Sequence, residues 1–126
     1  MSEASTANLS HWAAIPFAYL TTTGRRSGQA HRIEIWFAIE NDAIFLMAGG
    51  RDRSDWVRNL QANPSATIEL GTDRFTGVAT VLTESDPDDG AARRLLVGKY
   101  RSANDDLAEW GRTSLAVVIR NLQPVA

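Results

Sequence analysis

The sequence predicts a mainly β fold of the α+β class, built as an antiparallel sheet or barrel with a few short flanking helices. Its apolar runs are short, rich in β-branched and aromatic residues, and separated by turn sequences such as Asn41-Asp42. Strands joined by such tight turns pair antiparallel, whereas parallel strands need long crossover connections. The 126 residues are expected to form one domain over residues 1–126, with residues 1–8 disordered.

The strand expected over residues 31–40 has the clearest pattern. Its isoleucines alternate with residues that face the other way, among them Trp36. Asn41-Asp42 then predicts a hairpin to the apolar run 43–48, and the turn at 71–73 predicts a second hairpin. The almost wholly apolar run 115–120 is typical of a central strand. The expected strands are residues 17–23, 31–40, 43–48, 66–70, 74–82 and 115–120.

Short helices are expected between the strands. Asp86 followed by Pro87 is a strong start signal, because aspartate caps a helix well and proline fits its first turn. The residue before a proline avoids helical geometry, so Asn63-Pro64 ends the preceding helix. The expected helices are residues 9–14, a segment from Asp52 or Ser54 to Asn63, residues 87–100, and a segment from Asn104 through Trp110.

Composition excludes several classes of site and partner. The chain has no cysteine, which rules out disulfides, thiolate metal sites and a cysteine nucleophile. His11 and His31 lie far apart and form no ligand pair, so no metal site is expected. A net charge of −2 argues against nucleic-acid binding, and no run approaches the roughly 18 apolar residues of a membrane span. The N-terminus lacks the pattern of a signal peptide, so a cytoplasmic location is expected.

The segment 22–28, Thr-Thr-Gly-Arg-Arg-Ser-Gly, is the first candidate binding site. Its two glycines permit backbone conformations that expose successive amides, and such nests bind anions. Arg25 and Arg26 add fixed charge and forked donors that suit phosphate or carboxylate. Thr23 and Ser27 add hydroxyl groups. A solvent-exposed hairpin turn with ordinary surface arginines explains the same residues equally well, and the spacing of a P-loop is absent.

A second basic segment with glycines follows the run 43–48. Gly49-Gly50 leads through Arg51 to a helix N-terminus, which presents free amides and the positive end of the helix dipole. Taken alone, a plain strand-to-helix connection explains it equally well. Two such segments flanking one hairpin favour a small anionic ligand. Nothing in the sequence resembles a nucleophilic triad, so the chemistry is expected to come from a cofactor.

Two longer motifs resemble the deazaflavin-dependent nitroreductase and quinone reductase family. The first runs from Leu20 to Gln29 as LTTTGRRSGQ, and the second runs from Trp56 to Pro64 as WVRNLQANP. The resemblance covers residues 19 to about 70 and becomes loose over 86–111. It implies a split β-barrel and an F420-dependent oxidoreductase. Such an enzyme transfers a hydride to a small organic acceptor, such as a quinone, a nitroaromatic or an activated alkene.

The resemblance also implies where the ligands bind. It places the loop 24–28 near the phosphate and polyglutamate tail of F420, and the segments 31–36 and 48–50 against the deazaflavin ring. Trp36 and Tyr100 are the candidate substrate contacts, and Tyr100 is the candidate proton donor. The candidate cofactor-binding residues are Thr23, Gly24, Arg25, Arg26, Ser27, Ile33, Ile35, Ala48, Gly49, Gly50, Arg51, Trp56 and Asn59.

Two departures from the family pattern keep alternatives open. Many members carry Ser-Lys where this chain has Ala48-Gly49, and prolines in the strand that here reads 30–37. Arg51 can replace the missing lysine charge. The alternatives are an FMN-binding oxidoreductase of the same barrel superfamily and a non-enzymatic carrier of a hydrophobic ligand such as a fatty acid. The expected partner is a small-molecule substrate; a homodimer is left open, and stable membrane insertion is not expected.

Overall fold

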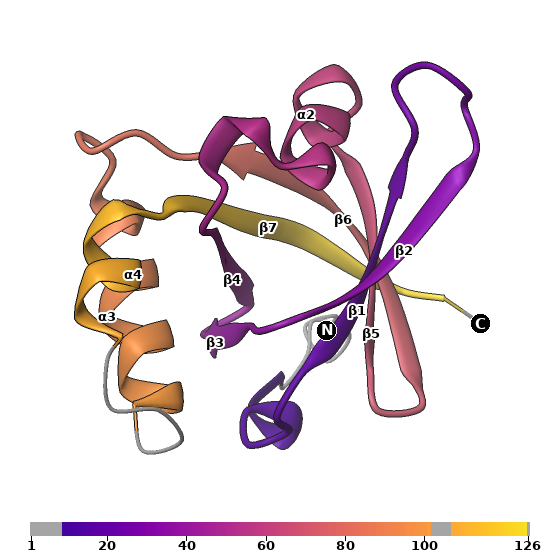
Figure 1. Ribbon diagram of the computed structural model, residues 1–126. Coiled ribbons are helices and arrows are strands. Elements are labelled where there is room, and N and C mark those ends of the chain that lie inside the picture. The colour runs from indigo at the N-terminus through magenta and orange to yellow at the C-terminus, as the bar shows by residue number, and fades with distance from the viewer. Residues whose placement is uncertain (1–8, 102–106, 126) are drawn as a thin grey trace.

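Figure 1 shows the computed structural model of the protein, which describes residues 9–101 and 107–125. Seven strands form one sheet in the order β2-β1-β5-β6-β7-β4-β3. Every neighbouring pair is antiparallel, so the expected mainly β, antiparallel fold is confirmed. The strands are β1 (Ala18–Thr23), β2 (Ala30–Ile35), β3 (Ala38–Glu40), β4 (Ala43–Ala48), β5 (Ser65–Leu70), β6 (Asp73–Val81) and β7 (Leu115–Pro124).

The sheet curls back on itself because its two edge strands are neighbours along the chain. β2 and β3 lie at opposite ends of the strand order, yet only Trp36 and Phe37 separate them in sequence. Consecutive Cα atoms are about 3.8 Å apart, so the end of one edge strand must meet the start of the other. Phe37 is fully buried at this corner. The result is a split barrel.

One strand expectation is wrong: residues 31–40 do not form a single strand. β2 pairs with β1, whereas β3 pairs with β4, and the chain changes direction at Trp36-Phe37. The apolar alternation continues through the break, because it reports which face a side chain takes and not which strand it pairs with. The Asn41-Asp42 turn is confirmed between β3 and β4, with Asn41 in the left-handed region at φ 58°.

β4 and β7 are the inner strands that separate two apolar clusters. Ile44 and Leu46 of β4 belong to the cluster that fills the barrel, and Phe45 and Met47 belong to the cluster beneath helix α3 (Pro87–Tyr100). All six residues of β4 are buried because both of its faces are covered. β7 lies between β6 and β4, which confirms the central position expected for run 115–120, although the strand extends to Pro124.

Helices cover the sheet on one side and close it at one end (Figure 1). α3 packs on β3, β4 and β7, and α2 packs against β1 and β6. The helix expected over 9–14 is a shorter 3-10 turn, and the cap expected at Asn104 lies outside the described residues, as do residues 1–8. Among the described residues, no helix combines the length and apolar character that crossing a membrane requires. The helices are η1 (Leu9–Trp12), η2 (Arg51–Arg53), α2 (Asp55–Ala62), α3 (Pro87–Tyr100) and α4 (Ala108–Thr113).

Candidate functional site

The loop between β1 and β2 is a compact turn closed by its own backbone. Gly24 N–H donates to Gln29 O at 2.7 Å, and Gly28 N–H donates to Gly24 O at 2.9 Å. Gly28 has φ +73°, a left-handed conformation that favours glycine. A Cβ on Gly24 would lie 2.7 Å from both His31 Nε2 and Ser27 Oγ, so a larger residue would displace these side chains. The two glycines therefore give the loop a defined shape.

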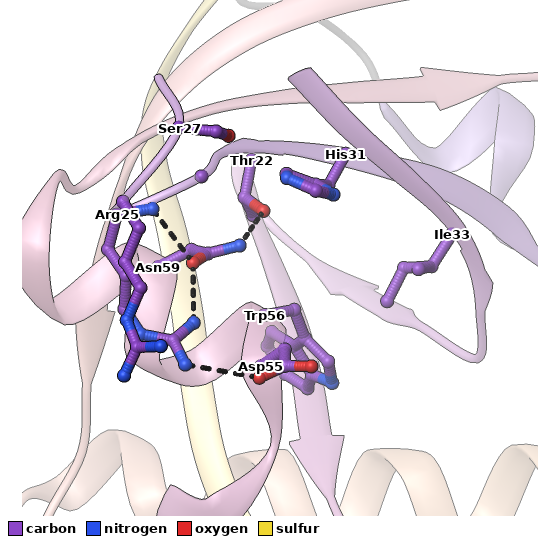
Figure 2. Close-up of a pocket in the computed structure, with 10 residues that line it drawn as sticks. Thr22, Arg25, Ser27, His31, Ile33, Asp55, Trp56 and Asn59 are labelled. Carbon is purple, nitrogen blue, oxygen red and sulfur yellow. Dashed lines mark hydrogen bonds and ion pairs between the residues drawn. The ribbon is translucent and has the colours of Figure 1, made fainter. Parts of the chain in front are cut away.

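Asn59 of α2 ties this loop to the barrel (Figure 2). Its Oδ1 accepts hydrogen bonds from Arg25 N–H at 3.2 Å and from Arg25 Nη1 at 2.9 Å. Its Nδ2 donates to Thr22 Oγ1 at 3.1 Å, and both Asn59 and Thr22 are buried. Arg25 Nη2 also pairs with Asp55 Oδ1 at 3.2 Å. The network thus holds the Arg25 guanidinium at one place.

A pocket of about 430 Å³ lies between this loop, β2 and the start of α2. Its volume falls within the roughly 300–1,000 Å³ typical of small-molecule sites. Two arginines and one carboxylate line it, together with the apolar side chains of Ile33 and Trp56. The lining residues are Thr22, Gly24, Arg25, Arg26, Ser27, His31, Ile33, Asp55, Trp56 and Asn59.

Several hydrogen-bond donors of the loop have no partner among the residues that the structure describes. Over residues 9–101 and 107–125, the Arg26 guanidinium makes no ion pair. Over the same ranges, the backbone N–H groups of Arg26 and Ser27 have no acceptor. Unpaired cationic and amide donors suit a phosphate or carboxylate ligand. The described residues contain no cluster of histidines and carboxylates that could hold a metal ion.

A second group of aromatic residues lies at the corner where β2 passes into β3. Trp36 stacks on Tyr100 with ring centroids 4.1 Å apart and planes 3° apart. Trp110 of α4 meets Trp36 edge-on at 5.5 Å. A Cβ on Gly49 would lie 3.5 Å from Cδ1 of Trp110, so the indole packs directly on this backbone. Trp36 is 36% exposed, which leaves part of its ring open to solvent.

α3 contributes two polar groups to this corner. The Tyr100 hydroxyl accepts a hydrogen bond from Phe37 N–H at 3.1 Å and lies within donating distance of Pro16 O, at 2.8 Å, and Phe37 O, at 3.1 Å. Burial raises the pKa of Tyr100. Lys99 Nζ donates to Phe37 O at 3.0 Å, and burial lowers the pKa of Lys99 to about 8.

The structure divides the candidate residues of the sequence into these two groups. Gly24, Arg25, Arg26, Ser27, Ile33, Trp56 and Asn59 line the pocket. Tyr100 stacks on Trp36, and both Trp36 and Gly49 contact Trp110. Thr23, Ile35, Ala48, Gly50 and Arg51 lie outside the pocket lining.

Arg51, the candidate substitute for the missing lysine, has a partner within the protein. It adopts φ 55°, and its Nη1 donates to Thr113 O at the end of α4. The contact joins the segment after β4 to α4, and the carbonyls of a helix end attract a cation. The guanidinium of Arg51 is therefore engaged by α4 rather than by the pocket.

Sequence reasoning overlooked Asp55 and included His31 only as part of the segment 31–36, and both residues line the pocket. Asp55 precedes Asn59 by one helical turn, and residues four apart share one face of a helix. That spacing is the signal that could have identified Asp55. His31 begins the segment that the resemblance places against the ring, and in the structure its imidazole lies close to Gly24.

Comparisons with known proteins agree with the fold and with the family resemblance. The model of the F420H(2)-dependent quinone reductase family matches residues 2–121. An F420H(2)-dependent quinone reductase of Mycobacterium tuberculosis (strain H37Rv) is 37% identical over 109 residues, which span 84% of this chain and 72% of that protein.

Solved structures show the same barrel. The structure of an F420-H2 dependent reductase, FDR-A, has a TM-score of 0.67 at 23% identity and covers 83% of this chain and 94% of its own. A structure described as a domain-swapped dimer has a TM-score of 0.68 at 22% identity and covers 83% of this chain and 80% of its own. At these identities the two structures support the split-barrel fold alone.

The family match extends over nearly the whole chain, whereas the resemblance in the sequence rested on two motifs in its first half. It confirms that resemblance. This chain belongs to the F420H(2)-dependent quinone reductase family, a family of oxidoreductases whose cofactor is F420.

Proposed function

We propose that this protein binds reduced F420 with the β1–β2 loop and uses it to reduce a small quinone. The main observation that supports this proposal is the pocket of about 430 Å³ lined by Arg25 and Arg26. Its donor set fits the cofactor: the arginines and the unpaired N–H groups of Arg26 and Ser27 suit the anionic tail. Ile33 and Trp56 offer apolar surface to the ring system.

When bound, reduced F420 supplies a hydride for the acceptor. The chain's own residues bind and orient the cofactor and the acceptor. Arg25 is already fixed by Asn59, so little side-chain entropy is lost when it meets an anion. Apolar walls at Ile33 and Trp56 exclude water. Holding two reactants in a productive arrangement lowers a barrier by roughly 7–11 kcal/mol, which is the main contribution expected of the protein.

We assign the acceptor contact to the exposed part of Trp36. Its ring is held flat by the stack on Tyr100 and from the edge by Trp110, so it offers a rigid surface for an aromatic or quinonoid ring. The Tyr100 hydroxyl already serves backbone groups of Phe37 and Pro16. For this reason we assign the proton needed by the reduced acceptor to solvent rather than to Tyr100.

Binding titrations test this proposal. Calorimetry with F420, FMN and a fatty acid should give a dissociation constant in the micromolar range or below for F420 only. Arg26→Ala should weaken F420 binding by about tenfold, because a charge-assisted contact is lost and no ion pair among the described residues is disturbed. Arg53→Ala is the matched control, since Arg53 is exposed and lies outside the pocket. Failure of F420 to bind at micromolar concentration, or tighter binding of FMN or the fatty acid, contradicts the proposal.

Two further expectations stay predictions. A homodimer would appear as a doubled mass in light scattering, and the cytoplasmic location would appear on fractionation of cells.

A further inference from the structure

The pocket contains a carboxylate where an anion is expected to bind. Asp55, the first residue of α2, lines the pocket and pairs with Arg25 through an Nη2–Oδ1 contact of 3.2 Å (Figure 2). A carboxylate that engages the binding arginine repels an incoming anion and occupies one of the donors that the anion needs. Among the described residues that line the pocket, Asp55 is therefore the one whose charge opposes the proposed ligand.

The two partners of Arg25 differ in how firmly they are held. Asn59 is 4% exposed, accepts two hydrogen bonds from Arg25 and is anchored to Thr22. The Asp55 side chain is 84% exposed. Among the described residues, it forms a hydrogen bond with Arg25 alone. The guanidinium thus keeps its place through Asn59 when Asp55 turns away. Asn59 therefore orients the Arg25 guanidinium, whereas Asp55 pairs with its charge.

We propose that Asp55 is a built-in competitor that occupies Arg25 until the anionic tail of the ligand displaces it. The inference rests on the proposed function of the pocket. Exchange of one carboxylate for another on Arg25 gives a singly charged ligand little advantage. A ligand with several anionic groups gains more, because it also reaches Arg26 and the free loop amides. Asp55 thereby lowers the affinity of the pocket for anions that engage Arg25, and a ligand with several anionic groups offsets this cost through its additional contacts.

Charge neutralisation at this position tests the inference. Asp55→Asn keeps the shape and the exposed setting but removes the charge. It should tighten binding of F420 and of inorganic pyrophosphate by about threefold to tenfold, the range expected for release of a partly exposed ion pair and loss of nearby repulsion. Asp52→Asn is the matched control, because Asp52 is exposed, precedes the same helix and lies outside the pocket. It should change both affinities by less than about twofold.

Calorimetry on the full chain measures both ligands, with circular dichroism to confirm that each variant is folded. Unchanged or weaker binding by Asp55→Asn overturns the inference, since an orienting role for Asp55 predicts weaker binding. The gain in affinity caused by Asp55→Asn should also be smaller in an Arg25→Ala background. An equal gain in that background shows a general charge effect and overturns direct competition.

The pyrophosphate arm separates this inference from the cofactor assignment. If wild-type protein binds pyrophosphate but not F420, the proposed function fails while the ratio of Asp55→Asn to wild-type affinity still decides the role of Asp55. Absence of pyrophosphate binding by both proteins overturns the inference together with the anion site.

Discussion

Asn59 shows how one buried amide can fix the position of a binding-site arginine. Its two ends bind different segments: Oδ1 receives the loop arginine, and Nδ2 reaches Thr22 in β1. A buried amide without partners would cost about 1–3 kcal/mol, so each of these contacts is strongly favoured by the fold. The hydrogen bonds that satisfy the buried amide of Asn59 thus also determine the position of Arg25.

Lys99 is a second residue whose setting can be measured. Its ammonium group lies 3.6 Å from the centroid of the Phe37 ring, and burial lowers the pKa of Lys99 from 10.5 to about 8. Because the folded-state pKa is lower, the folded protein loses this proton before the unfolded chain does. The free energy of unfolding should therefore rise between pH 8 and 10.5.

Urea unfolding at two pH values checks this prediction. From about pH 7.5 to about pH 9.5, wild type should gain on the order of 1 kcal/mol more than Lys99→Met, after discounting for the exposed part of the side chain. The raised pKa of Tyr100 acts in the opposite sense, and only above its ordinary value of 10.0, outside this interval. Parallel pH curves for the two proteins would contradict the assignment.

The candidate site was predictable where residue type alone carries the chemistry. Arginines between glycines predict an anion loop, and the structure places Arg25 and Arg26 on the pocket. The contacts of Arg25 with Asn59 and Asp55 were not predictable, because these two residues lie more than one element away in sequence and meet the loop only after α2 docks on β1. The same limit applies to Trp110, whose contact with Gly49 depends on the placement of α4.

At the scale of elements, the alternation of apolar residues and the turn residues predicted the strands, but they did not predict every pairing between the strands. The hairpins β3–β4 and β5–β6 follow from the turns Asn41-Asp42 and 71–73, since these connections are local. The pairing of β4 with β7 joins strands far apart in the chain, and no local pattern specifies it. The break at Trp36-Phe37 was missed for the same reason: it depends on which strands lie beside β2 and β3.

β6 contains an irregularity that depends on one glycine. The register of β6 with β7 shifts between Thr76 and Val78, and a Cβ on Gly77 would lie 2.7 Å from Ile119 Cγ2 and 2.9 Å from Arg120 O. The backbone oxygen cannot move aside as a flexible side chain can. The bulge therefore brings β6 and β7 closer than any larger residue allows.

Gly77→Ala should lower the free energy of unfolding by about 1–3 kcal/mol, as expected for overpacking. Gly98→Ala in α3 is the matched control, because a Cβ there meets no atom within 4 Å. It should raise the free energy of unfolding by roughly 0.5–1 kcal/mol through the better helix propensity of alanine. Urea denaturation measures both, and equal effects of the two substitutions would contradict the close approach of β6 and β7.

For the whole molecule, the decisive feature is how the barrel is held at its β2–β3 corner. The two edge strands of the sheet meet there, and α3 packs on β3 beside this corner. Tyr100 binds both the corner residue Phe37 and Pro16 before β1, while its ring supports Trp36. One side chain thus joins α3, the start of β1 and the corner. The proposed acceptor surface at Trp36 is part of this closure.

Tyr100→Phe separates a structural role of this residue from a catalytic one. Loss of the hydroxyl leaves the buried Phe37 N–H without its acceptor, so the free energy of unfolding should fall by about 1–3 kcal/mol. The stack on Trp36 is retained, so F420 affinity and quinone reduction should change by less than about tenfold. Tyr19→Phe is the control, because Tyr19 contributes its ring to Arg32 and its hydroxyl to no hydrogen bond among the described residues. A proton donor would behave differently: turnover would fall by roughly 10²–10⁴ with little change in stability, and that result would return Tyr100 to the reaction itself.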